Sequence, residues 1–257
     1  MSSKITATII TYNEEAHIGA CIDSLAGVAD EIVVIDSFST DATVEICRSR
    51  GCKITQRELN GYGAQRQYAT SMASHPYILS IDADEELSPS LARRLMEMKE
   101  RGFNHRVYSF TRLNFFCGKP IRHCGWYPDR QIRLFDKRYA NWNLRDVAES
   151  VIFRDSVRPQ PVDGDILHYR CSTPEEYSGT MTHQAELRAR VLAAADGSIS
   201  PLTPILKGVG AWWTTLITRG GWLDGKEGRL IAREEYRRTS RAYSRARQLS
   251  ADAKDEA

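Results

Sequence analysis

The 257-residue sequence lacks several features that would mark particular classes of protein. Its six cysteines form no Cys-x-x-Cys pair, so they predict neither a common zinc motif nor a disulfide framework. No apolar run approaches the ~20 residues of a membrane-spanning helix, and the run at 5–11 is too short for a signal-peptide core. The 35 basic residues hardly exceed the 33 acidic ones, which argues against nucleic acid as a partner. We therefore expect a cytoplasmic protein with reduced thiols.

The composition is that of an ordinary globular protein, with 42% hydrophobic and 26% charged residues. In its first hundred residues, apolar stretches of strand length alternate with segments of helical periodicity. The expected strands are 5–11, 31–36, 52–56 and 77–82, and the expected helices are 14–25, 40–50, 62–73 and one opening at Ser88-Pro89. Buried strands that alternate with helices predict an α/β fold, with a mostly parallel central sheet covered by helices on both faces.

The pattern changes after residue 106, where strands follow one another without helices between them. The further expected strands are 107–116, 131–135 and 166–169, with a loop at 117–130 that is rich in glycine, proline, tryptophan and histidine. The run Thr173-Pro-Glu-Glu176 is a cap signature for a following helix. We therefore expect an α/β domain over 1–172 and a helical C-terminal region over 173–257.

Residues 207–247 form a basic segment, with ten Lys or Arg against four Asp or Glu. This segment overlaps an apolar stretch, 205–217, that contains Trp212 and Trp213. An apolar, aromatic patch beside a basic helix suits the surface of an anionic membrane. The same composition is equally typical of a C-terminal helix with a solvated basic face. Peripheral membrane contact through 205–247 is thus one of two interpretations.

Acidic residues follow two of the expected strands, at the end where parallel sheets bind ligands. Asp82 and Asp84 come at the end of 77–82, and Asp36 ends 31–36. Two carboxylates there can share Mg²⁺ or Mn²⁺, which prefer oxygen ligands and substrate phosphates. An acidic loop leading into the next helix would look the same. Nearby, Arg66 follows two glycines and would face a phosphate from the first helical turn.

Four motifs together resemble the family 2 glycosyltransferases of GT-A fold. They are Thr11-Tyr-Asn-Glu-Glu15, Asp36-Ser-Phe-Ser-Thr-Asp41, Gly61-x-Gly-x-Gln-Arg66 and Asp82-Ala-Asp-Glu85. Two later runs, 125–135 and 221–228, resemble the branch that contains the lipopolysaccharide inner-core β-glucosyltransferases. The resemblance implies an inverting, metal-dependent transfer of a sugar, expected to be a hexose, from a nucleotide-sugar to a lipid-linked saccharide. A UDP-sugar is the expected donor, and the expected place is the inner face of the cytoplasmic membrane.

The resemblance also implies roles for individual residues. The nucleotide-sugar would be bound by Thr11, Tyr12, Glu14, Asp36, Arg66 and Asp82. Asp84 would hold the Mg²⁺ or Mn²⁺, and His168 would either complete that site or be a hydrogen-bonded structural histidine. The acceptor would be contacted by Trp126, Tyr127, Gln131 and Arg133, although the two aromatic residues could equally anchor their loop in the core.

The general base that an inverting transfer needs is left open between two carboxylates. Members of the family often carry Val-His-Glu after the strand at 131–135, whereas this sequence has Val147-Ala148-Glu149. The carboxylate is kept and the histidine is missing, so Glu149 is the first choice and Asp129 the second. The alternative for Glu149 is a surface acid paired with a nearby arginine.

Three other functions compete with this hypothesis. The acceptor could belong to capsule, exopolysaccharide or a protein-linked glycan. A nucleotidylyltransferase would pair a nucleotide pocket with acidic metal ligands too, but it usually has a glycine-rich basic loop after the first strand, where this chain has the acidic run 11–15. A non-catalytic sugar-nucleotide-binding module is the third, and the intact Asp82 and Asp84 argue against it.

Overall fold

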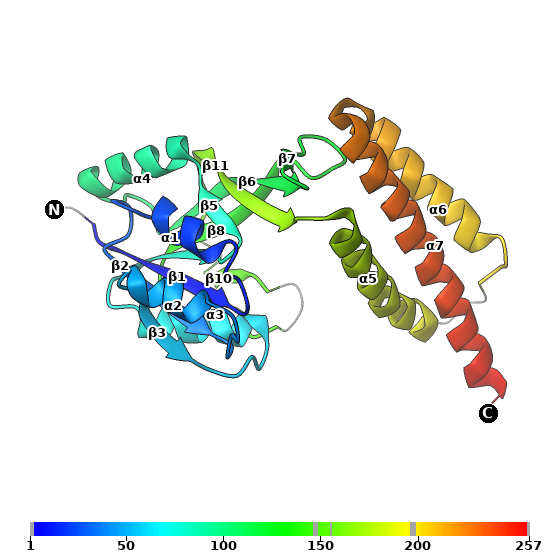
Figure 1. The fold of residues 1–257 in the computed structure, drawn as a ribbon, viewed down its shortest axis with the longest axis horizontal. Coiled ribbons are helices and arrows are strands. Elements are labelled where there is room, and N and C mark those ends of the chain that lie inside the picture. Colours follow the sequence, from blue (N-terminus) through cyan, green and yellow to red (C-terminus); the bar gives the residue numbers. More distant parts are fainter. Residues whose placement is uncertain (1–2, 146–148, 155, 196–198, 256–257) are drawn as a thin grey trace. The chain divides into compact units, whose positions relative to one another are not determined.

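The computed structural model describes residues 3–145, 149–154, 156–195 and 199–255, and it divides into two compact units. The sheet unit consists of Met1–Leu113 and Asp129–His168, and the helical unit consists of Asn114–Pro128 and Tyr169–Ala257 (Figure 1). Two strands, β6 (Val107–Phe116) and β11 (Gln160–Cys171), begin in the first unit and end in the second. A domain boundary at residue 172/173 stays a prediction.

A nine-stranded sheet forms the frame of the fold, in the order β3-β2-β1-β4-β8-β6-β11-β5, with β7 paired to β6. The remaining strands are β1 (Ile5–Thr11), β2 (Glu31–Asp36), β3 (Lys53–Gln56), β4 (Tyr77–Asp82), β5 (Glu85–Leu87), β7 (Lys119–Pro120) and β8 (Asp129–Asp136). Strands β3, β2, β1 and β4 are parallel, whereas β8 runs antiparallel to both β4 and β6. The α/β class is confirmed, and the sheet is mixed because the segment between β6 and β8 contains no helix for a parallel crossover.

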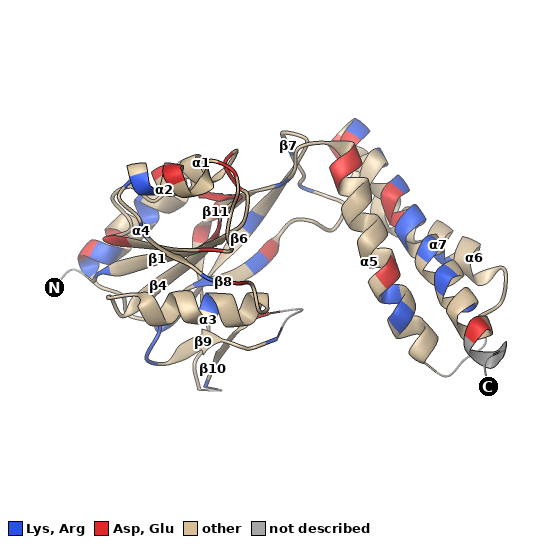
Figure 2. Cartoon of the chain, turned by 60° about the horizontal axis from the view of Figure 1, so that its bottom comes forward, with Lys and Arg blue, Asp and Glu red and all other residues tan. Residues whose placement is uncertain are grey.

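Helices and a small hairpin cover the two faces of the sheet unit. On one face, α1 (Ile18–Ser24), α2 (Thr43–Ser49) and α4 (Pro89–Arg101) share a buried cluster with β1 and β4. On the other face lie α3 (Tyr62–Met72) and the hairpin of β9 (Ala140–Trp142) and β10 (Val151–Phe153) (Figure 2). The expectation of helices on both faces is confirmed.

The alternation of side chains along β1 explains how one strand serves both layers. Ile5, Ala7 and Ile9 are fully buried with α1, and Ile10 packs toward α3. Burying one such isoleucine contributes ~1.5–3 kcal/mol. The start of α4 follows the predicted signature, because the Ser88 side chain accepts a hydrogen bond from the Leu91 amide and Pro89 fills the first helical position.

In its described residues, the helical unit contains three α-helices, α5 (Pro174–Ala194), α6 (Thr203–Trp213) and α7 (Gly225–Asp255), and α7 packs against both others. Between α6 and α7 the chain forms a π-helical turn, Thr214–Thr218, and a 3₁₀ turn, Gly221–Asp224. The predicted cap is confirmed, since the Thr173 side chain accepts from the Glu176 amide. Among the described residues, no helix is both long and apolar enough to cross a membrane.

Candidate functional site

Three of the predicted site residues end neighbouring parallel strands. In the strand register Thr11 pairs with Asp36, and Ile10 pairs with Asp82, so the carboxyl ends of β1, β2 and β4 meet at one edge. This is the edge at which open α/β sheets bind their ligands. The side chain of Thr11 is buried, and among the described residues its hydroxyl has no hydrogen-bond partner.

The loops after β1 and β2 are locked together by hydrogen bonds. Asn13 adopts a left-handed backbone, its amide donates to the Ser39 hydroxyl, and its side-chain oxygen accepts from the Thr40 amide. The Glu14 amide donates to the hydroxyl of Thr43. Tyr12 is left 57% exposed beside this framework. The sequence Thr11–Glu15 therefore builds a fixed backbone with one free aromatic side chain.

Asp36 is fully buried, and its carboxylate accepts hydrogen bonds from other residues of the sheet unit. It accepts hydrogen bonds from the Ser39 amide at 3.0 Å, the Ser39 hydroxyl at 2.5 Å and the Gln56 side chain at 3.0 Å. Phe38, which lies between Asp36 and Ser39 in the sequence, has a left-handed backbone and is 50% exposed. Asp36 thus holds the turn that presents Phe38. Sequence reasoning assigned no role to Phe38, although it lies inside the quoted motif.

Arg66 is buried at the start of α3 between two carboxylates and an aromatic ring. Its guanidinium lies 2.5 Å from Asp82 and 3.6 Å from Glu149, and its central carbon lies 4.8 Å from the centre of the Trp142 ring. Gly63 makes this approach of α3 to the Asn143–Arg145 segment feasible, because a Cβ there would overlap backbone carbonyl oxygens. The structure therefore brings Arg66, Asp82 and Glu149 together.

Behind Asp82, a network of charges crosses from β4 to the antiparallel strands. Arg133 of β8 donates to Asp82 at 2.8 Å and to Glu85 at 2.7 Å. Glu85 is fully buried, and it also accepts from Arg112 at 3.2 Å and from the Asp82 amide at 3.0 Å. Removing one partner of such a buried pair costs ~3–5 kcal/mol. The network fixes the end of β4.

The charges of this network control ionisation at the edge. Burial opposes the charged form of Asp82, but Arg133 and Arg66 hold the pKa of its carboxyl well below the usual range. Burial likewise opposes the charged form of Arg133, and Asp82 with Glu85 raises the pKa of that guanidinium. Glu85 and Arg112 were not assigned by sequence reasoning, because the ion pairs of Glu85 with Arg112 and Arg133 join residues that are 27 and 48 positions apart along the chain.

Asp84 and His168 lie next to each other, with Asp84 Oδ2 3.1 Å from His168 Nε2. The pairing of β5 with β11 sets this contact, since Glu85 and His168 are register partners. The side chains of Asp84 and His168 are 28% and 12% exposed, respectively. One carboxylate and one imidazole suit Mn²⁺ or Mg²⁺ when phosphate oxygens and water complete the shell. Among the described residues, no cluster of three or more potential metal ligands exists.

The two candidate bases differ in their surroundings. Asp129, at the start of β8, is held by Arg112 at 2.7 and 2.8 Å and by Gln131 at 2.7 Å. Glu149 is 24% exposed and lies beside Arg66. The preceding residues Val147 and Ala148, where members of the family often have a Val-His pair, lie outside the described residues.

The four predicted acceptor residues are divided between the two units. Arg133 and Gln131 lie in the sheet unit. Arg133 donates hydrogen bonds to Asp82 and Glu85, and Gln131 donates one to Asp129. Trp126 and Tyr127 belong to the helical unit. There the Trp126 ring packs against Phe116 and Tyr177, and Arg122 stacks over Tyr127. Trp126 thus has the contacts expected of a loop anchor, and its contact with acceptor stays a prediction.

Comparisons with known proteins point to one family. The sequence model described as "Glycosyl transferase family 2" matches residues 6–158. An uncharacterized glycosyltransferase of Rickettsia typhi is 34% identical over 67% of this chain and 62% of its own length. The lipopolysaccharide core biosynthesis glycosyltransferase LpsC of Rhizobium meliloti is 30% identical over 65% and 63%. This chain therefore spans less than two thirds of these relatives.

A solved structure gives a weaker likeness. Glucosyl-3-phosphoglycerate synthase from Mycobacterium tuberculosis, in complex with Mn²⁺, UDP and glucosyl-3-phosphoglycerate, is 24% identical over 44% of each chain, with a TM-score of 0.37. The family match is the stronger finding, because it covers more than half of the sequence and includes the Thr11, Asp36, Arg66 and Asp82 motifs. The chain belongs to glycosyl transferase family 2.

Proposed function

We propose that this chain transfers a sugar, with inversion, from a nucleotide-sugar to a lipid-linked saccharide. The observation that carries the proposal is the shared edge of β1, β2 and β4, where Arg66, Asp82 and Asp84 are held by the rest of the sheet unit. A nucleotide-sugar needs a pocket for the nucleoside, positive charge for the diphosphate and a base for the acceptor. The edge offers side chains for each task.

The nucleoside would lie over the locked loops after β1 and β2. Exposed aromatic rings at Tyr12 and Phe38 can stack on a planar base, and stacking of this kind contributes ~1–3 kcal/mol. The buried hydroxyl of Thr11 is an acceptor and donor for the nucleotide. Asp36 and Glu14 would act mainly through the loop backbone that they hold. Asp82 would contact the ribose while Arg66 keeps it ionised.

The diphosphate would lie between Arg66 and the Asp84–His168 pair. Asp84 and His168 would hold Mg²⁺ or Mn²⁺, which stabilises the charge of the departing nucleoside diphosphate. The guanidinium of Arg66 is buried, so its interaction with an added phosphate is weakly screened by solvent. Among the described residues, the Nε of Arg66 has no hydrogen-bond partner and could serve that phosphate.

Glu149 would be the general base. A base must reach the acceptor hydroxyl, and Asp129 is already held by the two bonds of one arginine and by Gln131. Glu149 is partly exposed and lies at the site through Arg66. Its carboxylate can therefore take a proton without losing the two hydrogen bonds that Arg112 makes to Asp129.

A saccharide of the lipopolysaccharide or lipooligosaccharide core is the acceptor that the similarity to LpsC supports. A lipid-linked acceptor requires the enzyme to work at a membrane surface. The helical unit has an exposed apolar surface that can contact a membrane, and we call it the α6 face. It consists of the exposed side chains of Leu202, Ile205, Leu206, Val209, Trp213, Ile217, Trp222 and Leu223.

The α6 face has the composition of a membrane-interface element. Ile205, Leu206, Val209 and Trp213 recur at helical spacing on one side of α6. Two side chains of the face, Trp213 and Trp222, are tryptophans, which favour the interface. Residues 199–223 contain no Asp or Glu, and both Lys207 and Arg219 are exposed. An apolar ridge whose segment 199–223 carries positive but no negative side chains complements an anionic bilayer. Membrane contact is therefore proposed for 202–223, which overlaps the first half of the segment 205–247 that the sequence indicated.

The transfer itself can be tested with a labelled UDP-sugar and lipooligosaccharide core in the presence of Mn²⁺. Asp84→Ala should lower turnover by at least about 100-fold, because the metal would lose its carboxylate ligand. Asp23→Ala is a matched control, since Asp23 is a surface acid paired with Arg50, and it should retain activity within about twofold. Wild-type turnover in Asp84→Ala would reject the metal assignment.

A further inference from the structure

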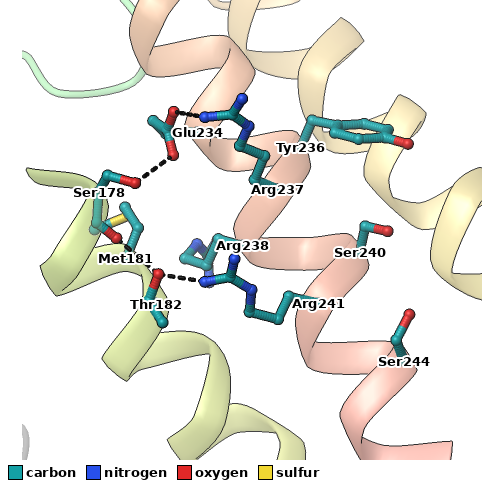
Figure 3. Close-up of a pocket in the computed structure, with 10 residues that line it drawn as sticks. All are labelled: Ser178, Met181, Thr182, Glu234, Tyr236, Arg237, Arg238, Ser240, Arg241 and Ser244. Atoms are coloured by element: carbon teal, nitrogen blue, oxygen red, sulfur yellow. Dashed lines mark hydrogen bonds and ion pairs between the residues drawn. The ribbon is translucent and has the colours of Figure 1, made fainter. Parts of the chain in front are cut away.

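A groove of about 520 Å³ in the helical unit is lined by side chains that neither the donor site nor the α6 face uses. It lies between α5 and α7, where side chains of both helices point toward one another (Figure 3). Ser178 and Thr182 come from α5, and Arg237, Arg238 and Arg241 come from α7. Hydroxyl groups and guanidinium groups, rather than apolar side chains, dominate this lining.

The hydrogen-bonding groups of the groove repeat once per helical turn. Residues four apart lie on the same face of a helix, about 5.4 Å apart along its axis. The groove contains three such pairs, which are Ser178 with Thr182, Arg237 with Arg241, and Ser240 with Ser244. Each pair therefore repeats its hydroxyl or guanidinium group once per helical turn along the groove.

The charges of the groove are unequal. Three arginines line it against one carboxylate, Glu234, which is 5% exposed. Glu234 binds Arg237 at 2.8 Å and Ser178 at 3.3 Å. Arg238 is paired outside the lining, with Glu235 at 2.6 Å.

Arg241 differs from the other two arginines of the groove in the partner of its guanidinium group. Its guanidinium reaches across to the hydroxyl of Thr182, which is a neutral partner (Figure 3). Within the described part of the chain, Arg241 forms no ion pair. A positive charge is thus held at the groove by a group that does not neutralise it.

We propose that this groove binds a phosphate-bearing ligand, with a phosphoryl group at Arg241 and a second one turn away at Arg237. Guanidinium groups bind phosphate oxygens through two parallel hydrogen bonds, and hydroxyls donate to the oxygens that remain. That the ligand is the saccharide acceptor is an inference that rests on the proposed function. The binding of phosphate at the groove does not depend on that function. A phosphorylated saccharide and a phospholipid headgroup share this chemistry.

The binding can be mapped on the wild-type chain by protection from phenylglyoxal, which modifies arginine. Inorganic pyrophosphate, added without a divalent cation, should slow modification of Arg241 and Arg237 severalfold in peptide maps. Arg247 is an exposed arginine of α7 outside the groove, and it should be modified at the same rate with and without pyrophosphate. Protection of Arg66 alone would report the donor site instead. That outcome, or equal protection of Arg247, would overturn the proposal.

Calorimetry on variants tests the role of Arg241, and protection by vesicles separates the two sources of phosphate. Arg241→Gln should weaken pyrophosphate binding about tenfold in calorimetry, while Arg247→Gln should leave it unchanged. If phosphatidylglycerol vesicles, and not pyrophosphate, protect Arg241, the headgroup is the ligand. If neither protects it, the groove binds no phosphate. Because UDP binding is measured in the same Arg241→Gln protein and should be unaltered, failure of the groove is distinct from failure of the proposed function.

Discussion

At the scale of single residues, Asp82 shows how the site holds a negative charge in a place where burial opposes it. Arg133 and Arg66 flank the carboxylate and keep its pKa well below the ordinary value. The same two arginines tie Asp82 to Glu85 and to Glu149. A ligand that meets this edge therefore finds charges whose positions are already set, which reduces the reorganisation that transfer requires.

The first prediction concerns the choice of base. Glu149→Gln should lower kcat by about 10²–10⁴-fold, because the acceptor hydroxyl loses its proton acceptor. Asp129→Asn should have the smaller effect, since Asp129 is held by Arg112. Both rates should be measured at saturating donor, with UDP affinity as the control for an intact site.

The opposite order of effects would identify Asp129 as the base. Equal and small losses would mean that neither carboxylate takes the proton. Loss of UDP binding in Glu149→Gln would indicate that Glu149 acts through Arg66, which lies 3.6 Å away.

At this scale the sequence predicted the residues that follow regular elements. Asp36 and Asp82 were found because each ends a strand, and Arg66 because it opens a helix. Glu85 and Arg112 were missed because their contacts depend on which strands become neighbours. That arrangement is decided by the antiparallel half of the sheet, for which local periodicity gives no signal.

At the scale of elements, four long strands were predicted with their bounds. The strand β11, Gln160–Cys171, was predicted only over 166–169, and the shortest strands were missed. The strands 5–11, 31–36, 77–82 and 107–116 have the predicted bounds. The three-residue strands β5, β9 and β10 were missed, since three residues are too few to show an alternation. The first helix begins at Ile18 rather than residue 14, because the loop after β1 uses its polar groups to bind the loop after β2.

The second prediction concerns how α3 is seated. In Gly63→Ala, the added Cβ would overlap the carbonyl oxygens of Asn143 and Arg145, so α3 must move and take Arg66 with it. The free energy of unfolding should fall by ~1–3 kcal/mol in urea titration, and UDP binding should weaken. Gly179→Ala is the control, because a Cβ on this glycine of α5 would meet no atom within 4 Å, and alanine favours the helix by up to ~1 kcal/mol. Equal stability of the two variants would show that α3 tolerates a wider spacing.

The third prediction concerns the α6 face. Leu206→Asp removes a 69% exposed apolar side chain and adds a negative charge, so binding to phosphatidylglycerol vesicles should fall at least about tenfold. Val191→Asp makes the same kind of change at a 71% exposed position on α5 and should leave vesicle binding unchanged. Flotation of the full chain without substrate is the measurement. Equal binding of the two variants would contradict the assignment.

At the scale of the whole molecule, the charge is divided along the chain. The net charge is +2, yet residues 207–247 alone carry an excess of six positive charges, so the rest of the chain is acidic overall. The basic excess lies in the helical unit, which contains both the α6 face and the arginine groove. Composition left two interpretations open for this region, an anionic membrane surface and a solvated basic face. It did not separate an apolar ridge from a polar groove, because that separation depends on how α5 and α6 pack on α7.

The central claim is that the edge of the sheet unit binds a nucleoside diphosphate with a metal. Calorimetry tests it most directly, by titrating the wild-type chain and Asp84→Ala with UDP, GDP and CDP, with and without Mn²⁺. The account predicts that one nucleotide, expected to be UDP, binds the wild-type chain at least about tenfold more tightly with Mn²⁺ than without it, and that Asp84→Ala loses this difference. Binding that ignores Mn²⁺ in both proteins, or no binding of any nucleotide, would contradict it.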